Sequence, residues 1–371
     1  MSTCNTEPTQ ENEAKMKEAL EARNAEDAKA TRELDKDTID NFRKAMGTLP
    51  GSQNPKTYDY MSAYDERATN VKMIDATPNP YKVMVAAATA TWGSGSTGYG
   101  EGSMGKWEKL TPEARFIVVI SVLTGNTLPQ AAEPVNFQFE FNGIPRHTFD
   151  QFARMRIGGA IQSIGCRDNS KLDAPLVLYP ELYAELQEDE DFKKDFENYI
   201  KVMKDMYERI LTRGSGSYQE ARAVLPMSYN HSFVTNINYL ALQGQSARRL
   251  MFCEESTIQW MFTKMRSEVE SQFPLLANYL RPVCDKVNKC VYSGGAEGLT
   301  KYFSNLYRGC GRHEDPHSYA EFNRSCTNVD EFDKVSKEQG YHLPGPGEWI
   351  NFTEFDYDKL DPKDKALFEE D

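Results

Sequence analysis

Hydrophobic and polar residues change their spacing along the chain, and the first clear pattern begins at Val71. The run VKMIDATPNP, residues 71–80, predicts a strand that ends in a Pro-Asn-Pro turn. The alanine-rich run YKVMVAAATATW, residues 81–92, predicts a helix. A second helix is predicted over LTPEARFIVVISVLTG, residues 110–125, because a Thr-Pro start and a glycine stop enclose its apolar residues. We therefore expect the folded core to begin near Val71.

The middle of the chain combines one alternating segment with longer helical ones. VNFQFEF, residues 135–141, alternates apolar and polar positions and predicts a half-buried strand. Apolar residues three and four apart over 192–210 predict an amphipathic helix. The stretch 232–273 is predicted as one long helix, because Gly244 is its only glycine and Pro274 ends it. We expect an α/β fold, with a mixed sheet and long helices.

The two ends of the chain are more charged than the middle. Residues 1–60 are predicted to form a charged helical arm, because Glu, Lys, Asp and Ala dominate and offer little to bury. Residues 61–312 are predicted to form the main domain. Residues 313–371 form an acidic extension with aromatic interruptions, which either packs as a strap or stays mobile.

Composition narrows the class of protein. The 371 residues are 39% hydrophobic, enough for a large core, and no apolar run approaches the roughly 18 residues of a membrane span. The start lacks a secretory signal, and the seven cysteines are scattered, which favours reduced thiols in the cytoplasm. A net charge of −13 disfavours a nucleic-acid surface. We expect a cytoplasmic enzyme with neither nucleic acid nor membrane as its partner.

Two glycine-rich patterns resemble phosphate-binding loops. Gly93 to Gly98 fits GxGxxG, but it follows a helix-like run where that motif follows a strand. Gly100 to Lys106 fits GxxxxGK, but Trp107 stands where a Ser or Thr would bind magnesium. We interpret both as a flexible surface loop, with a mobile lid near a site as the alternative.

Arginines concentrate in FNGIPRHTFDQFARMRIGGAIQSIGCRDNS, residues 141–170. Gln151 and Arg154 are three apart and share a helical face, Arg156 projects elsewhere, and Arg167 returns after a Gly-Gly bend. The planar guanidinium fork suits a pyrophosphate, a nucleotide phosphate or a pyrimidine carbonyl. The segment therefore predicts an anion site, with solvated arginines in surface pairs as the alternative.

A second polar group lies in EARAVLPMSYNHSFVTNINYLALQGQSARRL, residues 220–250. Asn238 and Arg249 are eleven residues apart, about three helical turns, so that they and Gln245 would share one face. Either this polar ridge binds a ligand, or its groups are satisfied by one another and by water.

The first of these segments resembles the signature of flavin-dependent thymidylate synthases, which has an Arg, then Gln-x-x-Arg-His-Arg, then Ser-x-Arg. The matching residues are Arg146, Gln151, Arg154, Met155, Arg156, Gly165, Cys166 and Arg167. The second segment resembles the family's Ala-Arg-x-Val-Leu-Pro. The matching residues are Ala221, Arg222, Val224, Leu225 and Pro226. Counting from that proline, the family's flavin-contacting Asn falls on Asn238 and its nucleotide-contacting Arg on Arg249. The resemblance covers roughly residues 66–312.

The resemblance implies an activity and a set of site residues. It implies reductive methylation of dUMP to dTMP, with FAD, NADPH and methylenetetrahydrofolate, by a homotetramer with sites between subunits. The residues implied to bind the substrate are Gln151, Arg167, Arg222 and Arg249. Arg249 is also the implied catalytic residue, and the residues implied to hold FAD are Arg154, Arg156 and Asn238. Two alternatives stay open: C5 methylation or hydroxymethylation of another pyrimidine nucleotide, and a non-catalytic nucleotide-binding paralogue.

Four positions depart from the family pattern. Met155 replaces the central His of Arg-His-Arg, Asn126 stands for a flavin-side His, and Gly165 replaces the motif Ser after one extra residue. Leu240 replaces an Arg two residues beyond Asn238. These changes affect the flavin and base contacts and leave the phosphate-binding arginines, so we expect a remodelled site.

A cluster of sulfur and imidazole side chains follows the long helical region. Its members are Cys253, Cys284, Cys290, Cys310, His313 and His317. The Cys-x5-Cys spacing is wider than in the usual zinc knuckle, so we expect reduced thiols and no metal, with a structural metal as the alternative.

Overall fold

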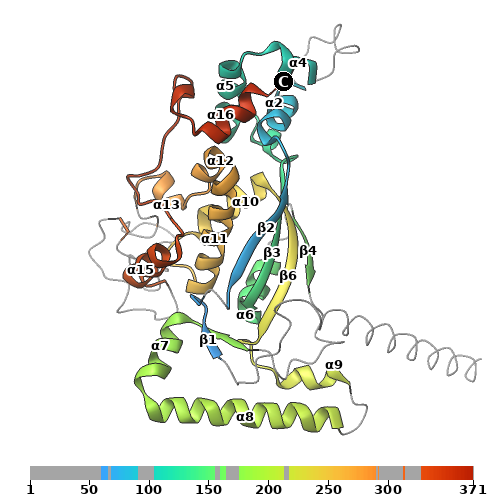
Figure 1. Cartoon of the computed structure of the whole chain (residues 1–371), viewed down its shortest axis with the longest axis vertical. Helices are drawn as coiled ribbons and strands as arrows, with labels where there is room; N and C mark the ends of the chain where they lie inside the picture. Colours follow the sequence, from blue (N-terminus) through green and yellow to red (C-terminus); the bar gives the residue numbers. More distant parts are fainter. Residues whose placement is uncertain are drawn as a thin grey trace, which may run out of the picture. The chain divides into compact units, whose positions relative to one another are not determined.

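The computed structural model places the following residues (Figure 1): 60–65, 68–90, 104–154, 159–163, 175–212, 217–289, 291, 312–313 and 327–370. The chain divides into two compact units, Met1–Thr57 and Tyr58–Asp371. All described residues belong to the second unit, so that residues 1–59 of the predicted N-terminal arm and residues 93–103 of the predicted glycine-rich loop lie outside them. The end of that loop is corrected, because Gly105 and Lys106 lie in a helix, α4 (Met104–Lys109). None of the described helices is both long enough and apolar enough to cross a membrane.

The centre of the second unit is a four-stranded antiparallel sheet. Its strands, in spatial order, are β2 (Asn70–Ala76), β3 (Asn136–Pro145), β6 (Asn230–Asn238) and β4 (Gly159–Ser163). Helices lie against this sheet, so the expected α/β fold is confirmed. The sheet itself is antiparallel throughout, where a mixed sheet was expected. The predicted strands at residues 71–76 and 135–141 are confirmed as well.

Buried aromatic side chains pack along the central strands and stabilise the sheet. Phe137, Phe139 and Phe141 alternate along β3, and each is fully buried. Phe141 stacks on Phe233 of β6, with ring centroids 4.4 Å apart. Gly143 has a φ of +72° beside Ala68, and a Cβ there would lie 1.0 Å from the Ala68 carbonyl oxygen, so only glycine fits this bulge.

The single helix predicted over 232–273 is wrong. The structure contains β6, then α10 (Tyr239–Arg249), then α11 (Ser256–Gln272). The first part alternates like a strand, because Phe233, Thr235 and Ile237 are buried while the residues between them are exposed. Residues 232–243 contain no glycine or proline, but this lack of turn residues did not indicate a continuous helix.

Helices cover one face of the sheet and extend beyond its end. Their bounds are α6 (Arg146–Ala153), α12 (Pro274–Asn278), α13 (Val283–Lys286), α2 (Pro80–Ala90), α4 (Met104–Lys109), α5 (Pro112–Leu123) and the 3-10 turn η1 (Pro129–Ala132). Helix α11 packs on β2, and α6 packs on β3 and β6. The two predicted helices α2 and α5 are confirmed. Thr111 caps α5 by accepting from the Ala114 amide, and Gly125 takes a φ of +76° just after its end.

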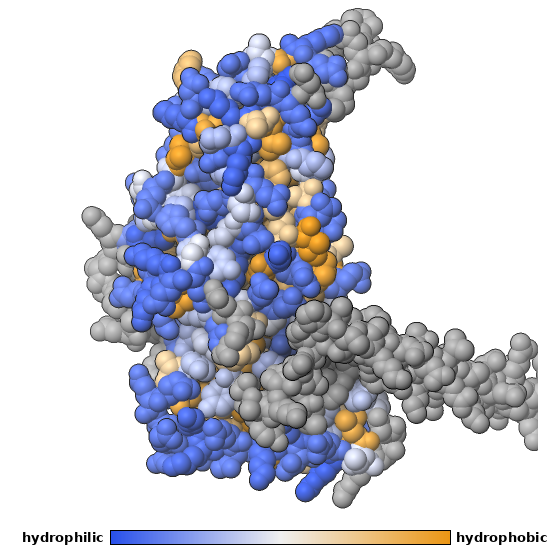
Figure 2. All heavy atoms as spheres, in the orientation of Figure 1, coloured by the Kyte–Doolittle hydropathy of each residue, from blue (hydrophilic) through white to orange (hydrophobic). Residues whose placement is uncertain are grey.

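A second, smaller core lies beside the sheet. Here β1 (Tyr60–Ser62) pairs in parallel with β5 (Leu176–Leu178), followed by α7 (Pro180–Glu188) and α8 (Glu190–Thr212). Two short elements complete it, α9 (Tyr218–Ala221) and η2 (Arg222–Val224). The amphipathic pattern had predicted α8 correctly: Ile200, Met203 and Tyr207 are buried, while its other side forms a mainly hydrophilic surface (Figure 2).

The described part of the C-terminal extension packs as a strap. It contains α15 (Val329–Gln339), η4 (Tyr357–Lys359) and α16 (Pro362–Glu369). Phe332, Trp349 and Phe368 belong to the main hydrophobic core, and Phe368 stacks on Tyr81 at 4.4 Å between centroids. Of the two alternatives left by the sequence, the structure has the packed one over residues 327–370.

Candidate functional site

Helix α6 carries the first predicted motif, and backbone contacts fix its N-terminal end relative to β6. The Arg146 and His147 amides each donate at 3.1 Å, to the Tyr229 and Met227 carbonyls just before β6 begins. Gly159 of β4 pairs with Ile237, near the other end of β6. Arg154, directly after the last residue of α6, is exposed. Arg156 lies outside the described residues.

Gln151 on α6 contacts the start of α11. Its Nε2 donates to Glu255 Oε2 at 3.2 Å, and the Thr148 hydroxyl donates to both oxygens of the same carboxylate at 3.3 Å. The Glu255 side chain is 10% exposed. The predicted substrate-binding Gln151 is thus held in place by an acidic side chain.

Arg249 is the last residue of α10 and pairs with the neighbouring loop. Its Nη1 donates to Glu254 Oε2, and Arg248 Nε donates to Glu254 Oε1 at 3.0 Å. The side chain of Arg249 is 21% exposed and that of Glu254 is 11% exposed. Gln151 and Arg249, from the two separate motifs, therefore contact the consecutive residues Glu255 and Glu254. That they form one substrate site stays a prediction.

Asn238 stands at the opposite end of the same helix. Its Oδ1 accepts from the Ala241 amide at 2.8 Å and caps α10. The predicted shared face with Arg249 needs correction, because Asn238 precedes the first helical turn and lies about 16 Å from Arg249 along the axis. Gln245 lies between them with its Oε1 buried, and no partner for that oxygen occurs in the part of the chain that is described.

The remaining predicted arginines are not placed beside Gln151 and Arg249. Arg222 is exposed on η2, which packs against α8 in the smaller core. Arg167 lies outside the described residues, as does Met155. Within one chain, the described site therefore consists of Gln151 and Arg249, with Arg154 and Asn238 farther along β6.

The residues at the sheet end suit a large anionic cofactor. The guanidinium of Arg154 is exposed, and the Asn238 cap uses the amide oxygen, which leaves the Nδ2 hydrogens to donate to a ligand. Gly159, five residues after Arg154, pairs with Ile237, which adjoins Asn238. Residues 155–158 between them lie outside the described residues, so a joint flavin site of Arg154 and Asn238 stays a prediction.

Sequence reasoning missed Glu254 and Glu255, because they were assigned to the interior of one long helix. The signal was present: Glu255 is followed by Ser256 and Thr257, and an acidic residue before such a pair is typical of a helix start. Splitting the predicted helix there would have placed both carboxylates in a loop beside Arg249.

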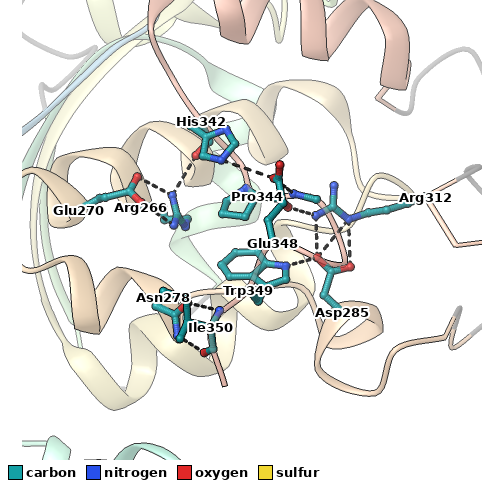
Figure 3. A network of polar contacts seen from close by, with 11 residues as sticks. Arg266, Glu270, Asn278, Asp285, Arg312, His342, Pro344, Glu348, Trp349 and Ile350 are labelled. Carbon is teal, nitrogen blue, oxygen red and sulfur yellow. Dashed lines mark hydrogen bonds and ion pairs between the residues drawn. The ribbon is translucent and has the colours of Figure 1, made fainter. Parts of the chain in front are cut away.

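Two members of the predicted sulfur and imidazole cluster, Cys284 and His313, lie beside Asp285. These three residues offer ligand atoms within 4.8 Å of one another, the one such group in the described ranges. Figure 3 shows Asp285 with two of its other partners, Arg312 and Trp349. The Asp285 carboxylate already accepts from Arg312 Nη2 at 2.6 Å, Trp349 Nε1 at 2.7 Å and His313 Nε2 at 2.9 Å.

Asp285 is therefore better suited to an ion pair than to a metal. Although its burial raises the pKa of this carboxyl, the Arg312 guanidinium and the Trp349 and His313 donors hold the pKa below its usual value. A divalent cation would have to displace Arg312, which is 7% exposed and also donates to the Pro344 carbonyl. The expectation of no metal stays a prediction, since Cys290, Cys310 and His317 lie outside the described residues.

Comparison with known proteins identifies a family. The family model described as thymidylate synthase complementing protein matches residues 72–275. A flavin-dependent thymidylate synthase from Clostridium tetani is 24% identical over 226 residues, which cover 58% of this chain and 87% of the relative.

Two solved structures are similar at low identity. The UMP/dUMP methylase PolB from Streptomyces cacaoi, bound with 5-Br dUMP, has a TM-score of 0.46 at 15% identity and covers 60% of this chain and 96% of its own. The flavin-dependent thymidylate synthase ThyX from Helicobacter pylori, complexed with FAD and dUMP, has a TM-score of 0.42 at 16% identity and covers 57% and 99%. TM-scores below 0.5 do not extend the assignment. The family model spans more than half of the chain, and so the protein is a divergent member of the flavin-dependent thymidylate synthase family.

Proposed function

We propose that this protein is an FAD-dependent thymidylate synthase that methylates dUMP at C5 to give dTMP. Methylenetetrahydrofolate would supply the carbon, and NADPH would reduce the flavin. The observation that supports this best is the meeting of Gln151 and Arg249, from two family motifs, at the consecutive residues Glu254 and Glu255.

The protein's own contribution would be binding and electrostatics. Arg249 is 21% exposed, so its guanidinium can meet a nucleotide while it stays paired with Glu254. A fixed positive charge beside the pyrimidine would draw electron density toward the ring carbonyls and make C5 and C6 more reactive. Gln151, next to it, can donate to or accept from a base or ribose edge.

FAD, when bound, would supply the hydride chemistry, and Arg154, Arg156 and Asn238 would hold it. Arg167 and Arg222 would complete the nucleotide site. Since Arg222 lies in the smaller core, a homotetramer with sites between subunits would let a second chain supply groups that one chain keeps apart. No residue of the chain needs to act as a covalent nucleophile in this scheme.

The cofactor proposal is tested by the colour and spectrum of the purified protein. We expect a non-covalently bound flavin, because the proposed contacts are hydrogen bonds and ion pairs. Denaturation should release a flavin chromophore. A protein that fails to bind FAD even after reconstitution would exclude the synthase.

The acceptor is tested by competition binding of dUMP against UMP and dCMP. We expect a preference for a uridine-type nucleotide, because a site that pairs with the base edge leaves polar groups unpaired when the wrong pyrimidine binds. A clear preference for dCMP would overturn the dUMP assignment. Equal, weak binding of all three would favour the non-catalytic alternative, in which Met155, Gly165 and Leu240 have removed the activity.

A further inference from the structure

Two consecutive glutamates connect α10 to α11, and their side chains point to different helices. The Glu254 amide donates to the Met251 carbonyl at 3.0 Å, which closes the turn after α10. Glu255 is the N-cap of α11, where its Oε1 accepts from the Thr257 amide at 3.0 Å. From this loop, Glu254 reaches back to α10, and Glu255 reaches across to α6.

Glu254 holds Arg249 on one side only. Its carboxylate accepts from Arg249 and Arg248, whose side chains are 21% and 64% exposed. An arginine carries five N–H donors in a rigid fork, so one bond to Glu254 orients the guanidinium and leaves other donors for a ligand. Holding the long side chain in advance also reduces the entropy that a ligand would have to offset on binding.

Glu255 is held by neutral donors. Its carboxylate accepts from Thr148 and Gln151 on α6 and from the Thr257 amide at the N-terminus of α11. His147 Nε2 lies 3.7 Å away. A carboxylate with a 10% exposed side chain requires such partners, and the positive end of a helix adds to them. Glu255 therefore links α6 to the N-terminus of α11 by polar contacts, in addition to the packing of Phe152 of α6 against Phe262 of α11.

We propose that Glu254 and Glu255 are positioning residues for the nucleotide site: Glu254 orients Arg249, and Glu255 fixes Gln151 together with α6. The proposal rests on the proposed function, because it assigns Arg249 and Gln151 to the nucleotide. Glu254 and Glu255 are adjacent in the chain, so the loop between α10 and α11 sets the distance between their carboxylates. The same loop therefore sets the separation of Arg249 and Gln151.

The test is dUMP titration by calorimetry with the full-length protein and five variants. Glu254→Ala and Glu255→Ala should each weaken dUMP binding about tenfold, because each removes the equivalent of one charge-assisted contact. Glu254→Gln should recover most of the affinity, because its amide oxygen still accepts from Arg249. Glu254→Ala combined with Arg249→Ala should bind no more weakly than Arg249→Ala alone, since Glu254 acts through that arginine.

Glu270→Ala is the matched control at the other end of α11. Glu270 accepts from Arg266 at 2.7 and 2.9 Å, so this variant also removes a carboxylate from a buried arginine. It should lower the unfolding temperature and leave dUMP binding unchanged. Hydrogen exchange gives a readout that needs no ligand: the amides of α6 should lose protection in Glu255→Ala and keep it in Glu270→Ala.

Each other outcome contradicts a defined part of the account. Tighter dUMP binding by Glu254→Ala would mean that Glu254 competes with the phosphate, and unchanged binding would mean that it has no role in the site. Unchanged exchange of α6 in Glu255→Ala would overturn the role of Glu255. If the wild-type protein binds no nucleotide, the proposed function fails and the positioning of Arg249 with it, while loss of α6 protection would still support the structural link through Glu255.

Discussion

Two buried carboxylate centres in this protein look alike in composition but differ in how they are satisfied. Asp285 is fully buried and is bound by Arg312, which is itself 7% exposed, and by Trp349 and His313. Glu254 binds Arg249, which keeps 21% exposure, and its neighbour Glu255 binds neutral side chains of α6. At the Asp285 centre the carboxylate and its arginine are both buried. At the Glu254–Glu255 centre Arg249 stays partly exposed, so that some of its N–H donors are available to a ligand.

Under the proposed function, this difference separates a structural network from a nucleotide-binding site. The Asp285 centre joins residues 285, 312–313 and 349, so it fastens the C-terminal strap to the core, as does the nearby pairing of Asn278 with Ile350 (Figure 3). The Glu254–Glu255 pair joins two helices that carry family motifs. Arginines with a carboxylate partner occur in both centres, so the presence of an ion pair alone does not identify function.

The largest effect on stability is expected for Asp285→Ala. The substitution leaves the buried Arg312 guanidinium without its partner, which typically costs about 3–5 kcal/mol of unfolding free energy. Urea denaturation of the variant and the wild type measures it. Glu348→Ala is the control, since its side chain is 62% exposed and should change little. A loss below about 1 kcal/mol for Asp285→Ala would contradict a closed network.

At the Glu254–Glu255 centre, Arg249→Ala should have the opposite effect to Asp285→Ala: the stability should change little, and dUMP binding should weaken strongly. A charge-assisted contact is worth about 1.5 to 3 kcal/mol, so dUMP affinity should fall roughly tenfold to a hundredfold. Calorimetric titration measures the loss, and urea denaturation measures the stability. Unchanged dUMP binding would show that the match of the second family segment is wrong.

A third buried carboxyl, Asp364 on α16, should behave unlike Asp285 when the pH changes. Burial raises the pKa of Asp364 to about 7, despite hydrogen bonds from the Tyr81 hydroxyl and the Leu275 amide. Burial likewise raises the pKa of Glu181 to about 7. Acids whose pKa is raised by folding favour the folded state when protonated, so their contribution is complete below about pH 4 and is lost as the pH rises through 7.

Stability from these two groups should therefore fall between about pH 4 and pH 7, as followed by thermal unfolding at each pH. Asp364→Asn should flatten this dependence, because an amide does not ionise. The ion-paired Asp285, with its lowered pKa, should instead lose its contribution only on acidification. A wild-type stability that rises steadily from about pH 4 to pH 7 would contradict the assignment for Asp364 and Glu181.

The smallest effect is expected for Asp150→Asn on α6. Asp150 pairs with Arg146 at 2.9 Å across one helical turn, and both side chains are about one-third exposed (32% and 35%). Such a pair contributes about 0.2–0.5 kcal/mol and is weakened by salt. Urea denaturation at low and high salt should show only this small loss. A loss above about 1 kcal/mol would mean that this surface pair contributes more to α6 than its exposure predicts.

The sequence predicted the elements whose ends are chemically marked. Thr111-Pro112 and Gly125 enclose α5, and the alternation of three phenylalanines identifies β3. It failed at β6, because His231 to Asn238 contains no glycine or proline, and the alternation was overlooked in favour of the helical residues that follow. The error hid the loop that contains Glu254 and Glu255.

The structure tests only part of the geometry of the predicted site, and its residues stay a prediction. Gln151 and Arg249, 98 positions apart in the sequence, contact the adjacent glutamates Glu255 and Glu254. Spacing alone suggested one helical face for Asn238 and Arg249, but the helix cap lies outside the regular turns, so the two residues are at opposite ends of α10. Packing between distant segments, such as η2 with α8, has no signal in local spacing.

The most direct test of the central claim is mass analysis of the product formed by the purified, FAD-reconstituted protein. With dUMP, methylenetetrahydrofolate and NADPH, the account predicts a nucleotide that is heavier than dUMP by one methylene and co-elutes with dTMP. The same mixture with Arg249→Ala should form it far more slowly. Recovery of unchanged dUMP from a flavin-loaded protein would contradict the proposed synthase, and a hydroxymethylated product would replace the methyl transfer with the related reaction.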